Sequence, residues 1–178
     1  MSHYRRIFIK GGTYFFTAVL ENRQTDLLCR YINEFRQAYA ETLSFYPFET
    51  IAICILPDHF HWVIRLPENE QNYSKILYSI KFNFTKRLPE TLKNPNQSKI
   101  NKQELGIWQR RFWEHTIRDD LDLERHIFYT YFNPVKHGYA KRVRDWAYSS
   151  FHRDVKLGLL PIDWGDCSDN EWQDLYQD

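Results

Sequence analysis

The segment LPDHFHWVIRL at residues 56–66 constrains the fold more than any other part of the chain. Pro57 breaks regular structure before it, and the residues after Asp58 then alternate with period two. Successive side chains of a strand point to opposite faces of a sheet, so His59 and His61 share one face. The other face carries Phe60, Trp62, Ile64 and Leu66. The pattern predicts a strand that seals a core with one face and presents two imidazoles on the other.

Two imidazoles that project side by side form half of a metal site. The alternative is a half-exposed strand that happens to carry two histidines. The spacing of His59 and His61 alone leaves both interpretations open.

Composition indicates a globular protein. At 178 residues, with 43% hydrophobic and 17% aromatic residues, the chain is long enough for a sizeable core, and this composition excludes a disordered protein. We predict a single domain over residues 1–178, with a core at 1–145 and a tail at 146–178 that ends in an acidic part.

Several absences favour a cytoplasmic protein that does not bind membranes. No stretch reaches the roughly 18 apolar residues of a membrane span, and the start of the chain lacks the apolar core of a signal peptide. The cysteines, which lack C-x-x-C spacing, indicate reduced thiols. They are Cys29, Cys54 and Cys167.

Charge is unevenly distributed although the net charge is only +1. Residues 163–178 hold six acids and no Lys or Arg, which leaves +7 on residues 1–162. Three stretches without acids, 1–20, 73–88 and 134–144, concentrate the basic residues among aromatic ones. Such patches suit a polyanion such as single-stranded nucleic acid, although each alone is equally consistent with a solvated helix face. The residues that we expect to contact DNA are Arg5, Arg6, Lys10, Lys136, Lys141, Arg142 and Arg144.

The order of predicted elements indicates the fold class. Strands are expected at 13–22, 48–56, 59–66 and 110–118, and helices at 25–43, at 73–88 and from Asp119 towards Asn133, with a long irregular segment at 89–106. Strand, helix, strand, strand, helix, strand is the order of a ferredoxin-like (RRM-like) α+β fold. We therefore predict an antiparallel sheet with helices on one face, an extra helix after the fourth strand and a tail packed on the domain.

The helix before Asn133 has two distinct faces. At about 100° per residue, Tyr131 falls among apolar residues and is expected to be buried, whereas Tyr129 shares the polar face with Asn133. Pro134 disfavours helical geometry at Asn133, so the helix is expected to end or kink there.

Tyr129 is a candidate nucleophile, but its spacing alone does not single it out among twelve tyrosines. A phenol has a pKa of about 10 and needs help to act near neutral pH, which a cation on the target phosphate would supply. A surface aromatic residue is the commoner role for a tyrosine in this position.

Five segments of the chain, in order, resemble the REP-associated tyrosine transposases, which are HUH single-tyrosine transposases related to IS200. These segments are YRRIFIKGGTYFFT, LPDHFHWVIRLPE, WQRRFWEHTIRDD, YFNPVKHG and WAYSSFHRDVKLGLLPIDWG. The resemblance implies that His59, His61 and Asn133 bind the metal and that Tyr129 is the nucleophile. Glu114 and Arg125 are secondary candidates for the site.

The resemblance also implies a metal-dependent endonuclease and strand transferase that acts on single-stranded hairpins of repetitive extragenic palindromic (REP) DNA. It implies a 5′-phosphotyrosine intermediate, Mg²⁺ or Mn²⁺ as the cofactor, no nucleotide cofactor, and a monomer that associates with the nucleoid when it binds DNA. Two alternatives remain: a catalytically silent protein that binds REP hairpins, and a metal-dependent hydrolase that uses water as the nucleophile.

Overall fold

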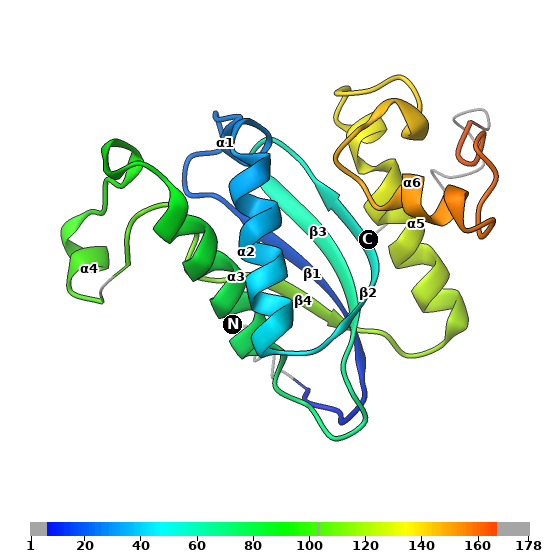
Figure 1. Ribbon diagram of the computed structural model, residues 1–178, viewed down its shortest axis with the longest axis horizontal. Helices are drawn as coiled ribbons and strands as arrows, with labels where there is room; N and C mark the ends of the chain where they lie inside the picture. The colour runs from blue at the N-terminus through cyan, green and yellow to red at the C-terminus, as the bar shows by residue number, and fades with distance from the viewer. Residues whose placement is uncertain (1–6, 103, 167–178) are drawn as a thin grey trace, which may run out of the picture.

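A four-stranded antiparallel sheet lies at the centre of the computed structural model, which describes residues 7–102 and 104–166 (Figure 1). The strands β1 (Thr13–Val19), β2 (Glu49–Ile55), β3 (His59–Arg65) and β4 (Trp113–Thr116) lie in the order β2-β3-β1-β4. Each strand runs antiparallel to its neighbours. The predicted α+β class with an antiparallel sheet is confirmed, and so is the period-two strand at the histidines.

Helices α1 (Leu27–Arg30), α2 (Ile32–Phe45) and α3 (Tyr73–Arg87) precede or follow the central hairpin, and α2 and α3 cover one face of the sheet (Figure 1). Between the helices and this face lies the larger core, which contains Phe60, Trp62 and Ile64 of β3. The single helix predicted over 25–43 is divided at Tyr31, where φ of −108° and ψ of 40° depart from helical values.

Helix α5 (Asp120–Lys136) packs on the opposite face of the sheet, together with η2 (Val143–Asp145) and α6 (Phe151–Lys156) (Figure 1). The Asp119 side chain caps this helix by accepting a hydrogen bond from the Asp122 backbone N–H at 2.8 Å. A second, smaller core joins the two layers. It comprises Phe15, Ala52, Val63, Tyr131, Val143 and Phe151.

The prediction that α5 could end at Asn133 is wrong, because the helix continues through Pro134 to Lys136. Pro134 is buried in the packed layer, and its carbonyl oxygen accepts a hydrogen bond from the Tyr139 backbone N–H at 2.8 Å. Tertiary packing thus outweighs the local preference of the residue before a proline.

The segment 89–106, predicted to be irregular, contains two short helices, η1 (Glu90–Leu92) and α4 (Gln97–Ile100). Asn96 caps α4, and the buried Lys99 ammonium donates hydrogen bonds to Glu21 and to the Trp108 carbonyl oxygen. Cys29 and Cys54 are free thiols, whereas Cys167 lies outside the described residues. Among the described residues, no helix is both long and apolar enough to cross a membrane.

Candidate active site

A cavity of about 710 Å³ lies between α5 and the sheet face opposite to α2 and α3. Strands β1, β3 and β4 supply its floor, and α5 supplies one wall. It is lined by Phe15, Thr17, Val19, Arg23, His59, His61, Trp113, Asp122, Arg125, His126, Tyr129, Lys136 and His137.

The two histidines of β3 lie in this cavity with their rings 4.9 Å apart. His59 Nδ1 is 2.7 Å from Asp58 Oδ1, and since a carboxylate only accepts, the imidazole donates. His61 Nδ1 is 2.9 Å from Thr17 Oγ1 on the neighbouring β1. Asp58 and Thr17 thus hold Nδ1 of the two rings, which leaves Nε2 of each ring as the possible ligand atom. Metal-bound histidines are commonly oriented by a partner on the other ring nitrogen in this way.

Asn133 on α5 completes the group. It is 1% exposed, and among the described residues Asn133 Oδ1 and Nδ2 and the buried His61 Nε2 form no hydrogen bond of standard geometry, although the Asn133 side chain lies against His61. Burial, followed by the charge of the nearby His59, lowers the pKa of His61 well below its ordinary value. Unpaired buried polar atoms cost about 1–3 kcal/mol each. The unpaired His61 nitrogen and Asn133 amide oxygen, with the His59 ring beside them, therefore suit a divalent cation.

Tyr129 lies against these ligands. Its ring meets that of His61 edge to face at 5.0 Å and that of Phe15 at 5.8 Å, and the Lys136 ammonium lies 5.1 Å from the Tyr129 ring centroid. A phenol in this position faces both the candidate metal site and a positive charge.

Tyr131, by contrast, points away from the cavity into the smaller core. It is fully buried, donates a hydrogen bond to Asp154 Oδ2 at 2.5 Å and contacts Ser150 Oγ at 2.9 Å. Burial and the adjacent Asp154 carboxylate raise the pKa of Tyr131 far above its ordinary value. The predicted burial of Tyr131 with a satisfied hydroxyl is confirmed.

The two secondary candidates for the site, Arg125 and Glu114, lie on different sides of the sheet. Arg125 lines the cavity. Glu114 does not, because period-two alternation along β4 sends it to the other face, where it is buried and accepts a hydrogen bond from the Tyr73 hydroxyl. The prediction that Glu114 belongs to the site is therefore wrong.

The basic residues predicted to contact DNA lie in different settings. Lys136 lines the cavity, whereas Lys10, Lys141 and Arg142 are exposed elsewhere. Arg144 forms an ion pair with Asp166 at 2.7 Å, so an acid beyond residue 162 partly neutralises this stretch. Arg5 and Arg6 lie outside the described residues.

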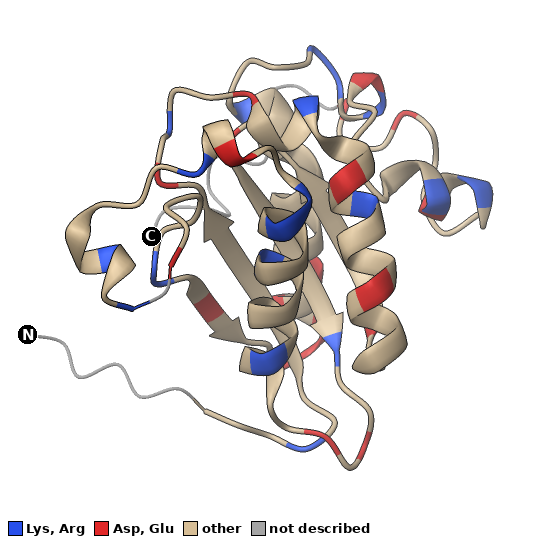
Figure 2. Cartoon of the chain, turned by 60° about the vertical axis from the view of Figure 1, so that its left-hand side comes forward, with Lys and Arg blue, Asp and Glu red and all other residues tan. Residues whose placement is uncertain are grey.

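The stretch 73–88 contains no acidic residue, but acidic residues from outside it pair with two of its basic side chains. Lys75 pairs with Glu70, and Arg87 pairs with Glu41 of α2. Figure 2 shows Lys and Arg distributed over several helices rather than gathered on one face. Glu70 lies just before the stretch, whereas Glu41 lies far from Arg87 in the sequence and comes near it only through the packing of α2 against α3.

The sequence analysis did not identify several residues that support the site. Arg23, from the loop after β1, pairs with Asp58 and lines the cavity. The His137 ring lies 5.3 Å from that of His59. The position of Asp58 directly before the histidine strand was a usable signal, whereas nothing in the sequence placed Arg23 there.

Comparisons with known proteins show the family to which the chain is related. A family model described as "Transposase IS200 like" matches residues 9–129. A Haemophilus influenzae protein assigned as a REP-associated tyrosine transposase is 58% identical over 165 residues, which cover 93% of this chain and 94% of that protein. The REP-associated tyrosine transposase of Escherichia coli K12 is 46% identical over 170 residues, which cover 95% and 94%. A solved structure of a REP-associated tyrosine transposase bound to a REP hairpin is similar with a TM-score of 0.79 and 43% identity, covering 92% of this chain and 91% of that one.

Proposed function

The chain belongs to the REP-associated tyrosine transposases of the IS200-like family, and on that basis we propose that it binds single-stranded REP hairpins and cleaves and rejoins DNA through Tyr129. One observation carries this proposal: the buried His61, whose Nε2 forms no hydrogen bond of standard geometry among the described residues, lines the same cavity as Tyr129, and the buried Asn133 amide lies against His61. The bound hairpin in the similar structure supports the choice of DNA.

His59, His61 and Asn133 would hold Mg²⁺ or Mn²⁺. Amide oxygen and water suit both ions, and imidazole favours Mn²⁺ over Mg²⁺. Such a cation would polarise a bound phosphate and stabilise the charge that develops on its oxygens. Because Asp58 and Thr17 hold Nδ1 of the two rings, Nε2 of each ring would be the ligand atom.

Tyr129 would supply the nucleophile. Its phenolic oxygen gives up a proton and attacks phosphorus, the bond from phosphorus to the 3′ oxygen breaks, and a 5′-phosphotyrosine and a free 3′-hydroxyl result. The reverse attack by a 3′-hydroxyl rejoins a strand. Because the phosphodiester energy is retained in the phosphotyrosine, no nucleotide cofactor is required. The Lys136 ammonium, 5.1 Å from the ring centroid, would favour the phenolate.

Phosphate binding would use the exposed basic residues around the cavity, with Lys136 closest to the nucleophile. We further propose that the protein acts as a monomer in the cytoplasm on nucleoid DNA. The family relationship and the basic residues support the DNA target.

The decisive experiment incubates the protein with a labelled single-stranded REP hairpin and Mn²⁺ and resolves the products on a denaturing gel. We expect a covalent adduct of protein and DNA that disappears with a chelator and in a His59→Ala, His61→Ala double variant, which should still bind the hairpin. His152→Ala is the matched control, because the His152 ring instead bonds the Trp146 carbonyl oxygen. It should form the adduct normally.

The same gel separates the alternatives. Binding without cleavage would identify a silent hairpin-binding protein. Cleavage without an adduct would identify a hydrolase that uses water. Full cleavage by the double variant would refute the assignment of the metal ligands.

A further inference from the structure

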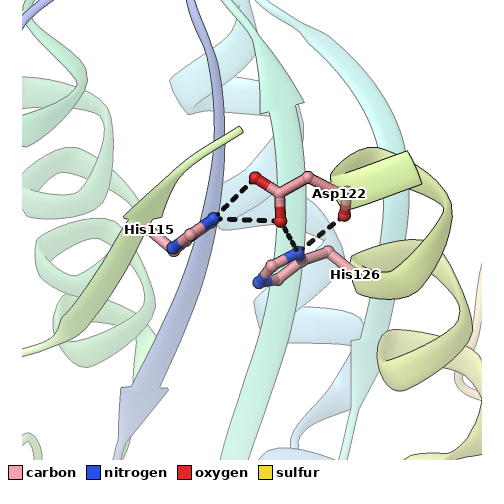
Figure 3. A group of neighbouring side chains, drawn as sticks. All are labelled: His115, Asp122 and His126. Atoms are coloured by element: carbon pink, nitrogen blue, oxygen red, sulfur yellow. Dashed lines mark hydrogen bonds and ion pairs between the residues drawn. The ribbon is translucent and has the colours of Figure 1, made fainter. Parts of the chain in front are cut away.

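A second group of potential ligands lies at the β4 side of the same cavity, which two of its members, Asp122 and His126, line. His115 of β4 and the Asp122 and His126 side chains of α5 converge, with one ligand atom from each residue within 4.8 Å of the others (Figure 3). No other group of three or more His, Cys, Asp or Glu residues in the described chain meets this criterion.

The distances between these atoms match a coordination shell. Asp122 Oδ1 lies 3.1 Å from His115 Nε2 and also 3.1 Å from His126 Nδ1. Ligands about 2.0–2.2 Å from one ion, at octahedral or tetrahedral angles, lie about 2.9–3.5 Å apart. The two edges through Asp122 therefore already have suitable lengths, and two imidazoles with one carboxylate are a common set for zinc and similar ions.

Neighbouring rings hold the two imidazoles in place. His115 and His126 stack at 4.4 Å with their planes 15° apart. Trp113 stacks on His115 at 6.0 Å, and Phe15 lies 4.9 Å from His126. The Arg118 backbone N–H donates to Asp122 Oδ2 at 2.9 Å, which orients the carboxylate. These contacts hold the two rings and the carboxylate close together before any ion binds.

The group is also accessible and ready to bind. The side chains of His115 and Asp122 are 23% and 18% exposed, so an ion can reach them from the cavity. Burial lowers the pKa of His126 below its ordinary value. The His115 ring donates to the Asp122 carboxylate, and the His126 Nδ1–H donates to the Asp122 backbone carbonyl oxygen at 2.8 Å. On binding, the ion would replace these two N–H hydrogens, and each ring would carry its proton on the other nitrogen.

Phe15 separates this group from the histidines of β3. Its ring centroid lies 5.6 Å from that of His61 and 4.9 Å from that of His126. With an aromatic ring between them, ions at the two places could not approach to the 3.5–4 Å of a shared two-metal centre. The second group is therefore a separate site.

We propose that His115, Asp122 and His126 form a second divalent-cation site, selective for zinc-like ions and distinct from the site at His59 and His61. The open positions of this ion would be completed by water or by an anionic oxygen within the cavity. The site does not depend on the proposed strand cleavage, since its ligands are set by the fold of β4 and α5.

The test counts bound ions in the full chain. Protein stripped with a chelator and transferred to chelator-free buffer is titrated with Co²⁺ and with Zn²⁺, using calorimetry and, for Co²⁺, visible absorption. We expect two equivalents in the wild type and one in a His115→Gln, His126→Gln variant. His152→Gln, the matched control, should keep two. Equal numbers of bound ions in the wild type and in the His115→Gln, His126→Gln variant would overturn the proposal, whether or not the site at His59 and His61 is filled.

A second variant guards against misfolding. Asp122→Asn retains an amide oxygen that can still accept from His115, so its unfolding temperature without metal should stay near that of the wild type. Its affinity for Zn²⁺ at this site should fall at least about tenfold, which reduces the rise in unfolding temperature that Zn²⁺ produces. An unchanged Zn²⁺ affinity would show that the three residues form only a hydrogen-bonded cluster. Strand cleavage plays no part in either readout, so failure of the proposed function leaves both tests intact.

Discussion

Tyr129 and Tyr131 lie two residues apart on α5, and removing one oxygen from each should have opposite consequences. Side chains two positions apart on a helix point about 160–200° away from each other. Tyr129 accordingly lines the cavity, whereas Tyr131 is buried in the smaller core. Tyr129→Phe and Tyr131→Phe are therefore matched perturbations of chemistry and of stability.

The cost of Tyr131→Phe follows from its partners. The hydroxyl donates to Asp154, and a hydrogen bond to a charged group contributes about 1.5–3 kcal/mol. Asp154 retains a contact from Arg153 Nε at 2.7 Å, so the carboxylate is not left unpaired. We therefore expect a loss of about 2 kcal/mol in the free energy of unfolding, which corresponds to a fall of about 4–8 °C in unfolding temperature for a chain of this size.

Tyr129→Phe keeps the ring and its contacts with His61, Phe15 and Lys136. Its unfolding temperature should change by less than that of Tyr131→Phe, since the cavity admits water to this position. Hairpin affinity should be preserved because the phosphate contacts are made elsewhere. The covalent adduct should fall to background, because the attacking oxygen is gone.

Thermal unfolding, hairpin binding and adduct formation are measured for both variants at a temperature where each is folded. The expected pattern is a stable, inactive Tyr129→Phe protein and a less stable, active Tyr131→Phe protein. A phosphodiester mapped to Tyr131 by mass spectrometry, or a normal adduct from Tyr129→Phe, would refute the argument from helix faces.

Three further predictions concern other parts of the structure. Asp58→Asn should weaken Mn²⁺ binding about 10–100-fold, measured by calorimetry, because it weakens the hydrogen bond that orients the His59 ring. Asp26→Asn, at an exposed ion pair, is the control, and equal Mn²⁺ affinities of the two variants would contradict the orienting role of Asp58. Lys136→Gln should weaken hairpin binding and reduce the magnitude of its slope against log salt by about 0.7, and an unchanged slope would argue against a phosphate contact. Burial lowers the pKa of Lys81 to about 8, compared with about 10.4 in an unfolded chain. Between these two pH values the unfolded state binds more protons than the folded state, so the free energy of unfolding should rise with pH. Urea titrations of Lys81→Met should show a smaller rise.

Much of the fold could be predicted because period-two and helical patterns are local. The alternation after Asp58 identified β3 and the face that carries His59 and His61, and the helical pattern separated Tyr129 from Tyr131. These assignments need only the geometry of one strand and one helix. The assignment of Asn133 and Tyr129 to specific roles depended on family resemblance, because spacing alone could not select them.

What the sequence could not provide depends on contacts between distant segments. Lys75 and Arg87 lie in a stretch without acids, yet their carboxylate partners come from a loop and from α2. Glu114 was a candidate for the site, but it lies one residue along β4 from Trp113 and His115, so its side chain points to the opposite face of the sheet, where it contacts Tyr73. Pro134 suggested a helix end because its local cost is visible in the sequence, whereas the packing that offsets this cost is not.

The continuation of α5 past Pro134 is what gives the site its arrangement. Tyr129, Asn133 and Lys136 follow one another at intervals of four and three residues, so on an unbroken helix they lie on one face over two turns. A helix that ended at Asn133 would still place the amide near His61, but it would release Lys136 from its position over the Tyr129 ring. The buried Pro134 therefore lies between Asn133, the candidate metal ligand, and Lys136, whose ammonium lies over the Tyr129 ring. The tertiary packing that keeps the helix intact at Pro134 also keeps Asn133 and Lys136 on the same face.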